Sequence, residues 1–251
     1  MEGTRKRTVL LSILSVFIIV FLFFFDKITV PLYIDFMVVN DFVDGENDAY
    51  VFKAILFSLI YFWIILLICK IFKVDRKGFG LTLGNSKRGL IWVLIIIVNA
   101  TLISLLYRWY GDDYSARPLI ELKYLIGQAH FNIPNAFLEE LLDRSIFLTL
   151  MLGVVSGRPF TSMHENTDKR RRVIAVIIIE LLFAISHIQV SFSPFEISFP
   201  WLQIINVFFL GVFDCVCFLR SGSVYWAAIG HASHNLTIRL ISTLFYLYLP
   251  I

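Results

Sequence analysis

Long unbroken blocks of apolar residues dominate the sequence and restrict the folds open to it. Hydrophobic residues make up 58% of the 251-residue chain, whereas charged residues make up only 16%. A soluble domain carries roughly 25% charged residues and has no need of apolar runs of about 20 residues. Helical runs of that length match the hydrocarbon thickness of a bilayer. We therefore expect an all-α fold, a polytopic bundle of transmembrane helices.

Seven blocks are predicted to cross the membrane. The first follows the basic residues Arg5-Lys6-Arg7, but it is long for a signal peptide and lacks a small-x-small cleavage site, so we expect a retained helix. An interfacial helix around Leu119–Ile126 is expected before the fourth block. The last block is either one tilted helix or a helix broken near Thr237–Arg239, which would add an eighth segment. The blocks are approximately Thr8–Phe25, Tyr50–Phe72, Gly89–Tyr107, Pro134–Gly153, Val173–Val190, Trp201–Leu219 and Val224–Ile251.

Charges alternate in sign from one loop to the next. The N-terminus and the segments Lys70–Arg88 and Arg158–Arg172 are rich in lysine and arginine, whereas Asp26–Asp48 is acidic. By the positive-inside rule, the N-terminus and the basic loops face the cytoplasm. The basic residues thus carry topological information, and we expect the lipid bilayer, not nucleic acid, as their partner. The three cysteines lie at the end of or inside apolar blocks and are expected to be buried filler.

Three groups of polar residues fall inside the predicted spans, where an ionisable side chain costs roughly 2.5 to 3.5 kcal/mol. In the first group, Glu140 and Arg144 are four residues apart and share a helix face, so they can pair. Glu139 points about 100° away, which leaves its carboxylate for another role. The alternative for this group is an ion pair that only fixes helix packing.

Histidines define the other two groups. His187 follows Phe183 by one helical turn, and a lone histidine at this place is also compatible with a packing role. His231 and Asn235 are four residues apart and share a face, with His234 beside it. A structural hydrogen-bond network between helices is the alternative interpretation of this third group.

Together, the three groups provide the chemistry of peptide-bond hydrolysis. A free carboxylate and a histidine can activate water, and a histidine with an amide can stabilise an oxyanion. The sequence has neither a G-x-S-x-G elbow nor an H-E-x-x-H helix, so a serine nucleophile or a zincin has no motif support. A proton-coupled transporter could also use buried Glu and His, but no inverted repeat is visible.

Three motifs resemble the signatures of the CPBP family of intramembrane proteases. They are Glu139-Glu140-x-x-x-Arg144, Phe183-x-x-x-His187 and His231-x-x-x-Asn235, with a typical Ser221-Gly222-Ser223 before the third. The family comprises CAAX prenyl-endopeptidases of the Rce1 type and bacterial Abi relatives, including bacteriocin-processing and immunity proteins. The resemblance implies one integral-membrane domain over residues 1–251, with a motif-bearing core at about 118–251. The short loops resemble those of a prokaryotic plasma-membrane member.

The resemblance also implies roles for these residues. Glu139 would activate the attacking water with help from His187, and His231 and Asn235 would form the oxyanion site. Glu140, Arg144 and Phe183 would support them. The family has been described both as metal-free, glutamate-dependent proteases and as metalloproteases. Asparagine is a poor zinc ligand, which favours no cofactor, but Glu139, His187 and His231 could form a three-ligand zinc site.

The implied substrate is a membrane-tethered, prenylated protein or a hydrophobic peptide. The alternative is a non-catalytic immunity or scaffold protein that binds a partner through the same polar cavity. Two positions depart from the family's pattern: the residue before Arg144 is commonly aromatic and the one after it glycine, but here they are Asp143 and Ser145. Asp143 lies four residues after Glu139, so two carboxylates are expected to crowd one site, or the pocket has been repurposed.

Overall fold

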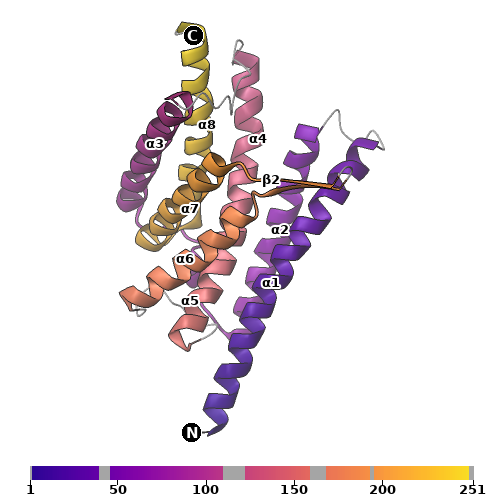
Figure 1. Cartoon of the computed structure of the whole chain (residues 1–251). Helices are drawn as coiled ribbons and strands as arrows, with labels where there is room; N and C mark the ends of the chain where they lie inside the picture. Colours follow the sequence, from indigo (N-terminus) through magenta and orange to yellow (C-terminus); the bar gives the residue numbers. More distant parts are fainter. Residues whose placement is uncertain (1, 40–45, 110–121, 159–167, 193–194, 249–251) are drawn as a thin grey trace.

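The protein is a bundle of long helices that run roughly along one direction (Figure 1). The computed structural model describes residues 2–39, 46–109, 122–158, 168–192 and 195–248. The helices are α1 (Glu2–Val39), α2 (Glu46–Phe72), the 3₁₀ turn η1 (Arg76–Phe79), α3 (Ser86–Trp109), α4 (Leu122–Glu140), the π-helix η2 (Leu141–Leu148), α5 (Thr149–Ser156), α6 (Lys169–Ile185), α7 (Trp201–Ser221) and α8 (Val224–Tyr248). Two short strands, β1 (Gln189–Phe192) and β2 (Phe195–Ser198), form an antiparallel hairpin between α6 and α7.

Apolar residues cover the outside of the bundle as well as its interior, as expected of helices in lipid. Four described helical segments are long and apolar enough to cross a membrane: Lys6–Thr29, Asp48–Phe72, Ser86–Leu106 and Trp201–Ser221. Side chains such as Phe17, Trp63 and Val98 are exposed on these segments. The predicted all-α membrane bundle is therefore confirmed, with the β1–β2 hairpin as a small addition to it.

The interior is built where α1, α2 and the segment η2–α5 meet α6 and α7. Buried residues from these elements form one continuous apolar cluster, which includes Ile19, Tyr61, Leu141, Phe147 and Phe218. On the other side, α8 packs against α3, α4 and α7. The helices α4, α6, α7 and α8 thus surround η2, and every residue of η2 is buried.

Three predicted boundaries change in the structure. α8 is one unbroken helix through Thr237–Arg239, which settles the alternative of a broken last segment within the described residues. The expected interfacial helix is wrong as a separate element, because its described part, residues 122–126, is the start of α4; the rest of Leu119–Ile126 lies outside the described residues. α6 ends at Ile185, so Val173–Val190 is not one helix and its last residues form a turn and the start of β1.

Candidate active site

The motif residues converge on the junction between α4 and η2. Glu139 and Glu140 are the last residues of α4, and the chain then winds as a π-helix through Arg144. π-helical segments inside α-helices are rare and are often found at functional sites. His187 lies in the turn after α6, and His231 lies in the second turn of α8. Residues from three distant parts of the chain therefore meet where α4 continues into the π-helix η2.

A fully buried arginine is the electrostatic centre of this region. The side chain of Arg144 is 0% exposed, and its Nε lies 3.1 Å from Oε2 of Glu140, the pair predicted from the i,i+4 spacing. Its Nη2 lies 3.3 Å from Oε2 of Glu180 on α6 and 3.9 Å from Oδ2 of Asp214 on α7. The guanidinium also lies 4.8 Å from the ring centroid of Phe183. One cation is thus shared among carboxylates from three helices.

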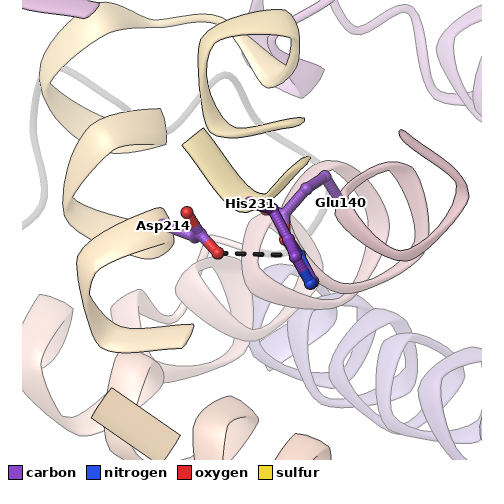
Figure 2. A group of neighbouring side chains, drawn as sticks. All are labelled: Glu140, Asp214 and His231. Carbon is purple, nitrogen blue, oxygen red and sulfur yellow. Dashed lines mark hydrogen bonds and ion pairs between the residues drawn. The ribbon is translucent and has the colours of Figure 1, made fainter. Parts of the chain in front are cut away.

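His231 bridges the two consecutive glutamates of the first motif. Its Nδ1 lies 2.8 Å from Oε1 of Glu140, and its Nε2 lies 3.5 Å from Oε2 of Glu139. Oδ2 of Asp214 lies 3.7 Å from the same Nδ1, and Figure 2 shows this carboxylate facing the imidazole from α7. Because Nδ1 is held by buried carboxylates, the ring orientation is set and Nε2 is directed to Glu139.

Two cavities meet at Glu139, whose side chain is 40% exposed although its neighbour Glu140 is completely buried. The smaller cavity, of about 180 Å³, is lined by all four residues predicted to be catalytic: Glu139, His187, His231 and Asn235. The larger, of about 270 Å³, shares Glu139, His187 and Phe183 with the first. The fold therefore brings the four residues to one hollow, while their roles stay predictions.

The turn after α6 presents His187 to both cavities. At the end of α6, two side chains contact the carbonyl oxygen of Phe183. Oγ of Ser186 donates a hydrogen bond to this oxygen at 2.7 Å, and Nδ1 of His187 lies 2.9 Å from it. The ring of Phe183 packs edge-on against His187 at 4.9 Å and against His231 at 6.2 Å between centroids. Phe183 thus separates and supports the two imidazoles.

Both departures from the family's pattern have a structural role. The hydroxyl of Ser145 donates to the carbonyl oxygen of Phe79 at 2.5 Å, which fastens η2 to η1. Oδ2 of Asp143 lies 3.5 Å from Nη1 of Arg144, and Asp143 lines the larger cavity together with Glu139. The expected crowding of two carboxylates at one cavity is therefore seen, with Arg144 beside one of them.

Among the described residues, the group of potential metal ligands that lie close together differs from Glu139, His187 and His231, so the set implied by the resemblance stays a prediction. Among the described residues, the one group of potential ligands within 4.8 Å of one another is Glu140, Asp214 and His231. This group does not fit a bound zinc ion well, because His231 Nδ1 already contacts Glu140 and the Arg144 guanidinium already faces both carboxylates. Positive charge at this point is supplied by the protein itself.

Two residues of the cluster, Glu180 and Asp214, were not predicted from the sequence. Both are fully buried, and Oε1 of Glu180 accepts a hydrogen bond from Sγ of Cys215 at 2.8 Å. A Cβ atom added to Gly211 would overlap the Glu180 carboxylate, so glycine makes room for this acid beside α7. The signal was present, since both acids fall inside predicted spans, where an ionisable residue is a candidate functional residue.

Comparison with known proteins agrees with the motifs. Residues 123–237 match the family model described as type II CAAX prenyl endopeptidase Rce1-like. This segment runs from the second residue of α4 into α8 and includes every motif residue discussed above. No curated protein and no solved structure is significantly similar to the chain. The predicted resemblance is confirmed for this region.

Proposed function

We propose that the chain is an intramembrane endopeptidase that hydrolyses a peptide bond of a prenylated protein or hydrophobic peptide, because residues 123–237 match the Rce1-like family model. The observation that carries the proposal is the pair Glu139 and His231. The partly exposed carboxylate of Glu139 lies 3.5 Å from Nε2 of His231. Both residues line the smaller cavity, which lies inside a helical membrane bundle. A substrate held to the bilayer by a lipid anchor can reach such a cavity without leaving the membrane.

In the proposed reaction, Glu139 acts as the general base and His187 assists. The carboxylate takes a proton from water as the water oxygen bonds to the carbonyl carbon of the substrate. The carbonyl oxygen becomes an oxyanion and is stabilised by the amide of Asn235 and by Nε2–H of a doubly protonated His231. When the C–N bond breaks, Glu139 returns the proton to the departing amine, so water is added across the bond and the enzyme is restored.

Buried neighbours support these roles. A histidine that donates through Nδ1 to Glu140 keeps one ring orientation, with Nε2 directed to the cavity. Arg144 in turn holds Glu140 from the opposite side, at 3.1 Å. Reactive groups held this way need little reorganisation during the reaction.

The proposed orientation places the N-terminus in the cytoplasm of a prokaryotic cell. In Figure 1, the N-terminus and the end of α5 lie at one end of the bundle and the C-terminus lies at the other. The basic residues described at the first of these ends are those of Lys70–Arg88, Arg158 and Lys169–Arg172, so the positive-inside rule puts this end in the cytoplasm.

The test is cleavage of quenched peptides by the purified protein in nanodiscs. A prenylated peptide and a library of hydrophobic peptides are compared for wild type, Glu139→Gln and His187→Ala, each with and without a zinc chelator. We expect Glu139→Gln to reduce cleavage by at least about a hundredfold, the usual range for loss of a general base. We expect His187→Ala to impair cleavage and the chelator to leave it unchanged.

Thermal unfolding of each variant shows whether it is folded, and Leu240→Ala, at an exposed position on α8, is the matched control. Cleavage that survives Glu139→Gln would contradict the proposed base. Loss of cleavage on chelation, with restoration by zinc, would replace the metal-free mechanism by a metal-dependent one. If wild type cleaves no peptide and Glu139→Ala leaves the biological effect intact, the Abi-type immunity or scaffold function would take its place.

A further inference from the structure

One buried histidine beside the third motif has no role in the proposed hydrolysis. His234 lies on α8, three residues after His231, and its side chain is fully buried. An imidazole inside a membrane bundle is costly unless its polar atoms have partners. Its Nδ1 lies 3.5 Å from Oδ1 of Asn235, the next residue, which lines the smaller cavity. Its Nε2 has no hydrogen-bond partner among the residues that the structure describes.

The contact between Nδ1 and Oδ1 determines which nitrogen of His234 carries the proton. A carboxamide oxygen can only accept a hydrogen bond, so the nitrogen that faces it must be the donor. A proton on Nε2 alone would leave this buried N–H without an acceptor, and it would turn the lone pair of Nδ1 towards the lone pairs of Oδ1. The neutral tautomer with its proton on Nδ1 avoids both costs and donates to Asn235.

The orientation of the Asn235 amide decides whether this residue can help the reaction. An oxyanion is stabilised by N–H donors, but a carboxamide carries, beside its NH2 group, an oxygen of nearly the same size. In the opposite orientation, Oδ1 of Asn235 would face the negative charge that develops on the substrate carbonyl and would repel it. A donor that holds Oδ1 leaves the NH2 group for the substrate. Nδ1 of His234 is placed to be that donor.

We propose that His234 is a positioning residue of the oxyanion site. Its Nδ1–H donates to Oδ1 of Asn235 and so leaves the NH2 group of Asn235 for the oxyanion. His234 itself contacts no reacting atom and exchanges no proton with the substrate. The inference rests on the proposed endopeptidase function and deepens it, because it names the residue that sets the orientation of the amide. The benefit arises in the transition state, where the oxyanion forms, and not in substrate binding.

The kinetic test uses the quenched peptide that the wild type cleaves best in nanodiscs, with four variants. His234→Phe removes both ring nitrogens. His234→Asn keeps an N–H group at the place of Nδ1, whereas His234→Gln puts one at the place of Nε2. His130→Phe, at an exposed histidine on α4, is the matched control. Thermal unfolding shows which variants are folded.

We expect His234→Phe to lower kcat by about tenfold, as for the loss of one hydrogen bond, and to leave KM nearly unchanged. His234→Asn should recover most of this loss and His234→Gln should not, while His130→Phe should match wild type. Asn235→Ala should lower kcat by about a hundredfold, and adding His234→Phe to it should cause no further fall, because no amide is left to orient. A fall of equal size in both backgrounds, or a rise in KM alone, would overturn the proposal.

A spectroscopic measurement on the wild type separates this proposal from the hydrolytic one. His234-Asn235 is the only His-Asn pair in the sequence, so labelling histidine with ¹³C and ¹⁵N and asparagine likewise assigns His234 by solid-state NMR in lipid. We expect a ring protonated at Nδ1, with this proton coupled through space to Cγ of Asn235. That result would support the proposal even if the wild type cleaved no peptide. A ring protonated at Nε2 alone would overturn it even if cleavage were observed.

Discussion

Nδ1 of His231 lies 2.8 Å from Oε1 of Glu140, across 91 residues of sequence. Both groups are almost completely buried, and the other carboxylate oxygen of Glu140 faces Nε of Arg144 at 3.1 Å. Glu140 is therefore the link between the arginine cluster and the imidazole at the cavity. Its neighbour Glu139 differs by one position in sequence but faces the cavity, so the two glutamates are expected to respond differently to substitution.

Glu140→Gln should damage both stability and activity. The amide cannot satisfy both Arg144 and His231 as the carboxylate does, and breaking a buried ion pair costs about 3 kcal/mol or more. We expect a clear fall in the unfolding temperature, measured in detergent, together with slower cleavage. Glu139→Gln should lower cleavage without a comparable fall in stability. Equal unfolding temperatures for Glu139→Gln and Glu140→Gln would show that Glu140 contributes no more to stability than Glu139.

Arg144→Met should be strongly destabilising, because it leaves the carboxylates of Glu140 and Glu180 buried without their cation. The expected loss in free energy of unfolding is about 3–5 kcal/mol. Adding Glu180→Gln to this variant should recover part of the loss, since one uncompensated charge is removed. Chemical unfolding of the single and double variants measures the coupling. Additive losses would show that Arg144 and Glu180 do not interact.

Gly211→Ala should destabilise the packing of α6 against α7. The new methyl group would overlap the carboxylate of Glu180, which is held in place by Arg144 and Cys215. Overpacking of this kind typically costs about 1–3 kcal/mol. The measurement is the unfolding temperature, with Gly211→Ala/Glu180→Ala as the second variant. The alanine at position 211 should be much better tolerated once the Glu180 side chain is shortened, and an equal penalty in both backgrounds would refute the overlap.

The cavities should be accessible from the side opposite the basic loops. Starting from Glu139, the polar residues that line the smaller cavity extend towards Asn132 on α4, Gln203 on α7 and Arg239 on α8, all in the direction of the C-terminal end of α8. With the N-terminus in the cytoplasm, this is the external side. Single cysteines at two exposed positions, Trp201→Cys near the start of α7 and Leu83→Cys before α3, test the orientation.

In intact cells, a membrane-impermeant maleimide should label Trp201→Cys and not Leu83→Cys, and permeabilised cells should show both. The three native cysteines are buried, so wild type treated with the same maleimide should not be labelled and serves as the control. Labelling of Leu83→Cys alone would reverse the orientation. The cavities would then face the cytoplasm, and the substrate would have to reach them from that side.

Contacts between side chains of one helix could be predicted from the sequence. The spacing of Glu140 and Arg144 predicted their ion pair, because residues four apart on a helix share a face. The contact between Phe183 and His187 also follows from this spacing, but the end of α6 at Ile185, before His187, was not predicted. α6 ends where Ser186 and His187 contact the carbonyl oxygen of Phe183, and the β1–β2 hairpin follows. The pattern of apolar residues in the sequence predicts neither feature.

The apolar blocks by themselves determined that this is a helical membrane protein, because only runs of that length and composition suit the bilayer interior. The motifs predicted the resemblance to the Rce1-like family, which the family model matches over residues 123–237. Only the tertiary structure decided that Glu180 and Asp214 join Glu140 around Arg144, and that Lys53 shares a cavity with Glu139. The physical reason is that helical periodicity relates residues a turn apart. Which faces of different helices meet depends on how the whole bundle packs and on where α4 continues into the π-helix.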